Sequence, residues 1–140
     1  MNPSLTPRGA IYSVGYEGTT VDDLVARLAQ HRVSLLVDVR LTPMSRRPEF
    51  SRRNLSVALA MAGIDYVHEP LFGNPAENRE AYRQGDPAAV ELMRARLDGM
   101  AQGAVEKLVE EARHRRVALL CVERDSSRCH RQLIADAATE

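Results

Sequence analysis

Short apolar runs alternate with amphipathic helical segments along this chain, and the alternation limits the fold more than any other feature. Runs typical of buried strands lie at residues 10–16, 33–40, 64–68 and 116–122. Between the first two, apolar residues recur at helical spacing after Thr20, a candidate N-cap. Such strands, joined by helical crossovers, form parallel sheets with helices on both faces. We therefore expect an α/β fold, a single Rossmann-like three-layer α/β/α domain over residues 1–140 with a mainly parallel sheet of about four strands.

The order of these strands decides where a ligand would bind. We expect the order 3-2-1-4, which reverses between the first and fourth strands, and ligands of such sheets bind outside the carboxyl ends at the reversal. Residues 69–87 contain three prolines and two glycines, show no regular period and are predicted to be a long loop. A long helical pattern then starts at Asp86 with Gly99 and Gly103 as candidate breaks, and the last helix is expected from about Ser126.

Composition excludes several classes of protein. Hydrophobic residues make up 44% and charged residues 27% of 140, as in folded soluble domains. The 19 basic and 19 acidic residues cancel, so no overall field attracts nucleic acid or an anionic membrane, and any anion site must be local. No apolar stretch approaches the roughly 20 residues of a membrane span, and the first ten residues lack a signal-peptide core, so a cytoplasmic location is expected. The two cysteines are expected to be free thiols.

Polar side chains follow each predicted strand at its carboxyl end, where the loops of a parallel sheet converge. The candidates, in chain order, are Tyr16, Arg40, Ser45, Arg46, His68, Glu123, Cys129, His130 and Arg131.

Arginines are concentrated after the second predicted strand. A guanidinium is a planar fork of donors that suits phosphate or carboxylate, although a solvated basic face is the alternative interpretation. Arg40 directly follows an apolar strand, where a charge needs a partner, and Asp38 could pair either with Arg40 or with backbone donors. The five arginines are Arg40, Arg46, Arg47, Arg52 and Arg53.

The two cysteines lie on either side of the loop that follows the fourth strand. Cys121 is either a small buried hydrophobe or a nucleophile. Cys129 is expected in the first turn of the last helix, where the helix dipole and unpaired N–H groups favour a thiolate. Because neighbouring helical residues point about 100° apart, we expect only one of Cys129 and His130 to face the sheet edge. Glu123 is either a general acid or base or the ion-pair partner of an arginine.

These motifs resemble those of the domain-of-unknown-function 488 family. The resemblance covers most of the chain and rests on "YSVGY", "LLVDVRLTPMSRRPEFSRRNL", "GIDYVHEPLFGN" and "LLCVERDSSRCHRQLIAD", in this order, whereas residues 75–103 fit least well. It implies the fold and the site but no particular reaction. The positions that fit the family pattern are Gly15, Asp38, Arg40, Pro43, Ser45, Phe50, Ser51, His68, Gly73, Cys121, Glu123, Cys129, His130 and Arg131.

The first functional hypothesis is an enzyme with an arginine-rich anion pocket that acts on a phosphate-bearing substrate, such as a nucleotide or nucleic acid. Catalytic roles would fall to Glu123, His130 and Cys129, and no cofactor is expected. The predicted substrate-binding residues are Arg40, Ser45, Arg46, Arg131, Tyr16 and His68.

Three alternatives remain open from sequence. A thiol-dependent enzyme similar to rhodaneses or cysteine phosphatases is disfavoured by Glu123 and Asp125, because an anion cradle is poorly served by carboxylates. A non-catalytic nucleic-acid-binding module is weakened by zero net charge and by only four tyrosines, two phenylalanines and no tryptophan. A metal site lacks any paired C-x-x-C spacing, so none is predicted; its candidate ligands would be Cys121, Cys129, His130 and His68.

Overall fold

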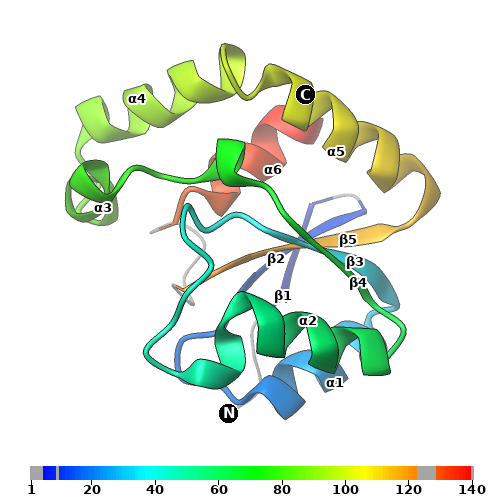
Figure 1. Ribbon diagram of the computed structural model, residues 1–140. Helices are drawn as coiled ribbons and strands as arrows, with labels where there is room; N and C mark the ends of the chain where they lie inside the picture. The colour runs from blue at the N-terminus through cyan, green and yellow to red at the C-terminus, as the bar shows by residue number, and fades with distance from the viewer. Residues whose placement is uncertain (1–4, 9, 123–128, 140) are drawn as a thin grey trace.

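The computed structural model describes residues 5–8, 10–122 and 129–139, which alternate strands with helices as expected (Figure 1). The elements are β1 (Leu5–Arg8), β2 (Ile11–Gly15), α1 (Val21–Gln30), β3 (Val33–Asp38), the 3₁₀ turn η1 (Pro48–Phe50), α2 (Arg52–Met61), β4 (Asp65–His68), the 3₁₀ turn η2 (Pro70–Phe72), α3 (Ala76–Arg83), α4 (Pro87–Asp98), α5 (Gln102–His114), β5 (Arg116–Cys121) and α6 (Arg131–Thr139).

The sheet has the order β1-β2-β5-β3-β4. β2, β5, β3 and β4 run parallel, and β1, which the sequence interpretation missed, pairs antiparallel with β2. The α/β class is therefore confirmed, but the predicted strand order 3-2-1-4 is wrong, because β5 lies between β2 and β3. The burial pattern agrees with this order: residues 117–121 of β5 are all buried, as in a central strand, whereas all four residues of β4, an edge strand, are at least partly exposed.

Helices cover both faces of the sheet, which gives three layers (Figure 1). On one face, Leu24 of α1 and Leu55 of α2 pack against Leu36 and Leu120. The opposite face is covered by α4, α5 and α6, and its buried cluster includes Leu97, Leu108, Ile134, Val37 and Leu119.

Local signals set several element boundaries. The Thr20 hydroxyl accepts a hydrogen bond from the Asp23 backbone N–H at 3.1 Å and so caps α1. The long helical pattern breaks at Gly99 into α4 and α5. The predicted loop at 69–87 is wrong in part, because it contains η2 and α3. None of the helices in the described ranges combines the length and apolarity of a membrane span.

The crossovers place a ligand-binding edge at the carboxyl end of β5. After β2 and β3 the chain forms α1 and α2 on one face, whereas the element that follows β5 in the described chain, α6, packs on the other face. Ligands of open α/β sheets bind where neighbouring strands lead to opposite faces. The predicted adjacency of the first and fourth strands, now β2 and β5, is confirmed, so this edge remains the expected site.

Candidate functional site

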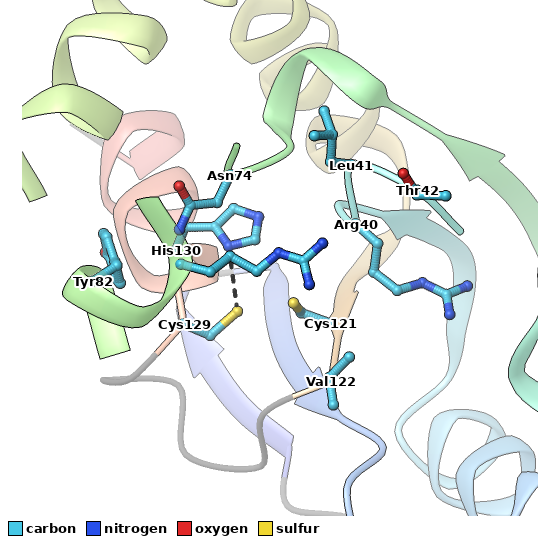
Figure 2. A pocket seen from close by; sticks show the side chains of 10 residues that line it. Arg40, Leu41, Thr42, Asn74, Tyr82, Cys121, Val122, Cys129 and His130 are labelled. Carbon is cyan, nitrogen blue, oxygen red and sulfur yellow. Dashed lines mark hydrogen bonds between the residues drawn. The ribbon is translucent and has the colours of Figure 1, made fainter. Parts of the chain in front are cut away.

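A cavity of about 50 Å³ lies at the carboxyl end of β5 (Figure 2). It has room for a few waters or one small polyatomic group. The segment after β3, the surroundings of α3, the end of β5 and the start of α6 all contribute side chains. The lining residues are Arg40, Leu41, Thr42, Asn74, Arg79, Tyr82, Cys121, Val122, Cys129 and His130.

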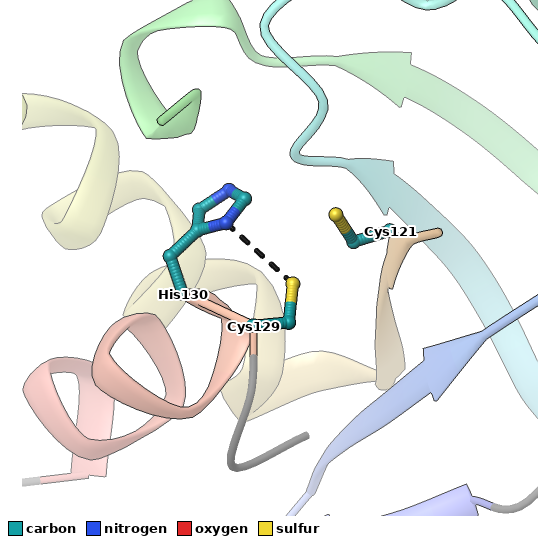
Figure 3. Close-up of side chains that lie close together, drawn as sticks. All are labelled: Cys121, Cys129 and His130. Carbon is teal, nitrogen blue, oxygen red and sulfur yellow. Dashed lines mark hydrogen bonds between the residues drawn. The ribbon is translucent and has the colours of Figure 1, made fainter. Parts of the chain in front are cut away.

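Two thiols and an imidazole among the lining residues lie close together (Figure 3). One ligand atom from each of Cys121, Cys129 and His130 lies within 4.8 Å of the others, and all three residues are buried. Both cysteines are thiols outside any disulfide in the described chain, as predicted. We call these three residues the thiol–imidazole cluster.

The hydrogen bonds of His130 fix how its ring is protonated. Its Nε2 atom lies 2.9 Å from the carbonyl oxygen of Val39, and because a carbonyl only accepts, Nε2 must carry a proton. In the neutral ring the other nitrogen, Nδ1, is then an acceptor, and it lies 3.5 Å from Cys129 Sγ. The pair is therefore arranged for proton transfer from the thiol to Nδ1.

Cys129 and His130 both line the cavity, so the expectation that only one would face the sheet edge is wrong. That expectation assumed that both lie within the helix. The last helix begins at Arg131, so the helical separation of about 100° does not apply to the two residues before it. Ser126, the expected helix start, lies outside the described residues.

Arg40 is buried, and its guanidinium is directed away from His130 (Figure 2). Nε and Nη2 donate to the two carboxylate oxygens of Asp38 at 2.8 and 2.6 Å, while Nη1 donates to the Tyr16 hydroxyl and the Phe50 carbonyl. Burial alone would lower the pKa of Arg40, but the hydrogen bonds and charge of Asp38 outweigh it and raise that pKa. Most N–H donors of the Arg40 guanidinium, which the sequence predicted to bind phosphate, are therefore already bonded to protein groups.

Asp38 connects the end of β3 to β4 and to the segment after β3. Besides the guanidinium, its carboxylate accepts from the Arg40 backbone N–H and from the Tyr66 hydroxyl. Both partners proposed for Asp38 from sequence, Arg40 and a backbone donor, are thus present. Burial, and then the hydrogen bond and charge of Asp38, raise the pKa of Tyr66.

The other predicted substrate-binding residues are not among those that line the cavity in the described chain. Tyr16 is buried and stacks on Phe50, with ring centroids 4.3 Å apart. His68 Nε2 contacts the Arg40 carbonyl at 2.7 Å. The remaining three are Ser45, whose Oγ accepts from a backbone N–H at 3.1 Å, Arg46, which is exposed, and Arg131, which is fully buried at the start of α6. Glu123, predicted to be catalytic, lies outside the described residues.

Three lining residues come from the segment predicted to be a loop, and sequence reasoning missed them. Asn74 and Tyr82 are buried, and Arg79 is exposed on α3. Burial, and then the charge of Cys129, raise the pKa of Tyr82 to about 12. A signal was available, because "NPAENREAYR" has a proline at a helix start followed by strong helix formers.

The fold and site define an α/β protein with a thiol–imidazole cluster at the carboxyl edge of its sheet. The chain belongs to the family of the domain of unknown function DUF488, whose model matches residues 20–138. Among curated proteins, none matches this sequence.

Two solved structures resemble this fold, both from Shewanella putrefaciens CN-32 and both described as "Putative phosphatase (DUF442)". The first has a TM-score of 0.50 and 15% identity, with 96% of this chain and 68% of the other covered. The second has a TM-score of 0.48 and 14% identity, with 94% and 66% covered. At 15% identity, the similarity to the first of these structures supports a shared fold and nothing further.

Proposed function

We propose that this protein is a thiol-dependent hydrolase of phosphate-bearing substrates, with Cys129 as the nucleophile. The observation that carries the proposal is the Cys129–His130 pair, in which Nδ1 lies 3.5 Å from Sγ while the Val39 carbonyl holds the proton on Nε2. A nucleophile, a base and a group that orients the base are the three parts of an activated nucleophile. The nucleophile and the base both line one cavity.

The chemistry follows from the tautomer. His130 Nδ1 takes the proton of Cys129, and the thiolate attacks phosphorus. The bond from phosphorus to the leaving oxygen breaks, and that oxygen takes the proton back from Nδ1. Water, deprotonated by His130, then attacks the phosphorus of the phosphocysteine; the S–P bond breaks and the returning proton restores the thiol. Glu123 remains the residue predicted from sequence to assist with these protons.

The cavity suits a small anionic group. About 50 Å³ holds one phosphate-sized group, so the rest of the substrate would lie outside. Arg79 supplies positive charge at the exposed side, and the Asn74 amide, whose Oδ1 accepts from Asn78, has N–H donors. Arg40 is assigned a structural role, because its guanidinium is bonded to Asp38, Tyr16 and Phe50.

The choice of phosphate esters as the first substrate class has two supports. The sequence hypothesis already favoured a phosphate-bearing ligand at this edge. The description of the structural neighbour also contains the word phosphatase. The thiol route, second in the sequence interpretation, moves to first place because Cys129 has a base beside it.

Release of inorganic phosphate from p-nitrophenyl phosphate and from mononucleotides tests the proposal. We expect Cys129→Ser to lower kcat by at least about 1,000-fold and His130→Ala by at least about 100-fold. Arg79→Ala should mainly raise KM, because an exposed charge acts on substrate binding. His114→Ala, an exposed histidine on α5, is the matched control and should retain parent turnover.

Two results would contradict the assignment. The first is a parent protein, reduced and folded by circular dichroism, that releases no phosphate from any of these esters. The second is a Cys129→Ser variant that keeps parent turnover; if Cys121→Ser alone abolishes it, the nucleophile is Cys121 instead.

A further inference from the structure

We infer that the thiol–imidazole cluster is a binding site for Zn²⁺, with Cys121, Cys129 and His130 as its three protein ligands. Two thiolates and one imidazole are among the donor sets that bind zinc in proteins, and such sites need not have paired C-x-x-C spacing when the fold brings the ligands together. Here the end of β5 supplies one ligand and the segment before α6 supplies two.

The distances fit a tetrahedral ion. With Zn–S bonds of about 2.3 Å and Zn–N bonds of about 2.0 Å, a sulfur and a nitrogen on one tetrahedral zinc lie about 3.5 Å apart, and two sulfurs about 3.8 Å apart. Cys129 Sγ and His130 Nδ1 are already 3.5 Å apart. The ligand atoms lie within 4.8 Å of one another, so a shift of Cys121 of roughly 1 Å brings its sulfur to a bonding position.

The second contact of His130 has the form seen around metal ligands. A histidine that binds a metal through one nitrogen usually donates its other N–H to a carboxylate or backbone carbonyl, which fixes the ring. The Val39 carbonyl, 2.9 Å from Nε2, provides this contact and leaves the lone pair of Nδ1 directed at the sulfur. The imidazole is therefore oriented before any ion arrives.

Charge and space also favour the ion. Two thiolates cancel the charge of Zn²⁺, which reduces the cost of placing it among buried residues. The adjoining cavity of about 50 Å³ accommodates a water or small anion as a fourth ligand. Three protein ligands and one exchangeable position describe an open zinc site rather than a closed structural one.

Zinc binding has a consequence for catalysis, and this consequence alone rests on the proposed function. The ion would engage Cys129 Sγ and His130 Nδ1, the two atoms that proton transfer requires. Occupied protein should therefore be inactive, and a chelator should restore turnover.

The test is a titration of the reduced, metal-free full chain with Zn²⁺ against a chromophoric chelator, under anaerobic conditions. We expect one equivalent to bind and protons to be released, because the thiols ionise. Co²⁺ in place of Zn²⁺ should give thiolate-to-metal charge-transfer absorption. Cys121→Ser, Cys129→Ser and His130→Ala should each weaken binding by at least about 100-fold. His114→Ala, which removes an exposed histidine, should bind as the parent does.

Each outcome decides the inference. It is overturned if the parent binds Zn²⁺ no more tightly than Cys129→Ser, if the Co²⁺ complex lacks charge-transfer absorption, or if His114→Ala weakens binding as much as the cluster variants. Circular dichroism of each variant, and Cys121→Ala and Cys129→Ala as second substitutions, separate loss of ligand from loss of fold. Zinc binding without phosphate release would leave the inference standing and remove the proposed function, whereas phosphate release without zinc binding would do the reverse.

Discussion

Asp38 and Arg40 form a bidentate ion pair that is almost completely buried, with Nε–Oδ1 and Nη2–Oδ2 distances of 2.8 and 2.6 Å. The same guanidinium donates to the Phe50 carbonyl at the end of η1. The pair thus connects the end of β3 to the segment that leads into α2 and holds the backbone that forms part of the cavity wall.

Arg40→Ala should lower the free energy of unfolding by about 3–5 kcal/mol, because it leaves the Asp38 carboxylate buried without its charged partner. Arg46→Ala, at an exposed arginine of the same segment, should change it by less than about 0.5 kcal/mol. Urea unfolding of both variants measures the difference. Equal stabilities would restore Arg40 as a candidate ligand arginine.

Gly73 packs directly against the chain at Leu41, a lining residue of the cavity. A Cβ at Gly73 would lie 2.5 Å from Leu41 Cα, a backbone atom that cannot rotate away. Gly73→Ala should therefore destabilise the protein by about 1–3 kcal/mol. Gly103→Ala, which meets no atom within 4 Å and lies in α5, should stabilise it by roughly 0.5–1 kcal/mol. Thermal unfolding of both variants checks the opposite signs, and destabilisation by both would contradict the packing argument.

The side chain of Asn78 connects α3 to α4 beside the cavity. Its Nδ2 donates to Asn74 Oδ1 at 2.9 Å and to the Ala89 carbonyl at 3.1 Å. Asn78→Ala leaves both buried acceptors without this donor and should cost about 1–3 kcal/mol of stability. Asn54→Ala, which removes an exposed bond to the Pro48 carbonyl, is the matched control and should cost less than about 1 kcal/mol in the same urea experiment. A control that loses as much as Asn78→Ala would show that burial does not set the cost.

Alkaline pH should weaken the fold through Tyr82. Its pKa is raised from 10.0 to about 12, so the folded protein holds this proton where the unfolded chain has lost it. The free energy of unfolding therefore falls as pH rises through this interval. Tyr82→Phe should show a smaller fall, measured by urea unfolding below and above pH 10; an equal fall in parent and variant would refute the assignment. Every other titratable group, including Lys107, the only lysine, is present in both the parent and Tyr82→Phe, so the difference between them reports on Tyr82.

The sequence predicted most elements because their signals are local. Thr20 caps α1 and Gly63, with φ near +75°, follows α2, and neither depends on distant residues. Which strands are neighbours depends on packing across the whole chain, so the predicted strand order was wrong. The sequence did contain a hint, because "VALLC" of the central strand β5 is more apolar than "DYVH" of the edge strand β4. For the site, Cys129 and His130 were named from their chemistry. The roles of Val39 and Arg79 were missed because a carbonyl contact and a helix side chain at the cavity carry no motif.

Among the parallel strands, β3 is the next after β2 along the chain. The two strands do not pair with each other, because β5 lies between them and pairs with both. During synthesis from the N-terminus, β1–β2 and β3–β4 can form only as separate pieces until Arg116–Cys121 have left the ribosome. Joining them closes long loops, so this sheet folds late and through contacts distant in sequence. Because β5 also delivers Cys121, the step that makes the sheet continuous places the first member of the thiol–imidazole cluster, and Cys129 and His130 then complete it from the segment before α6.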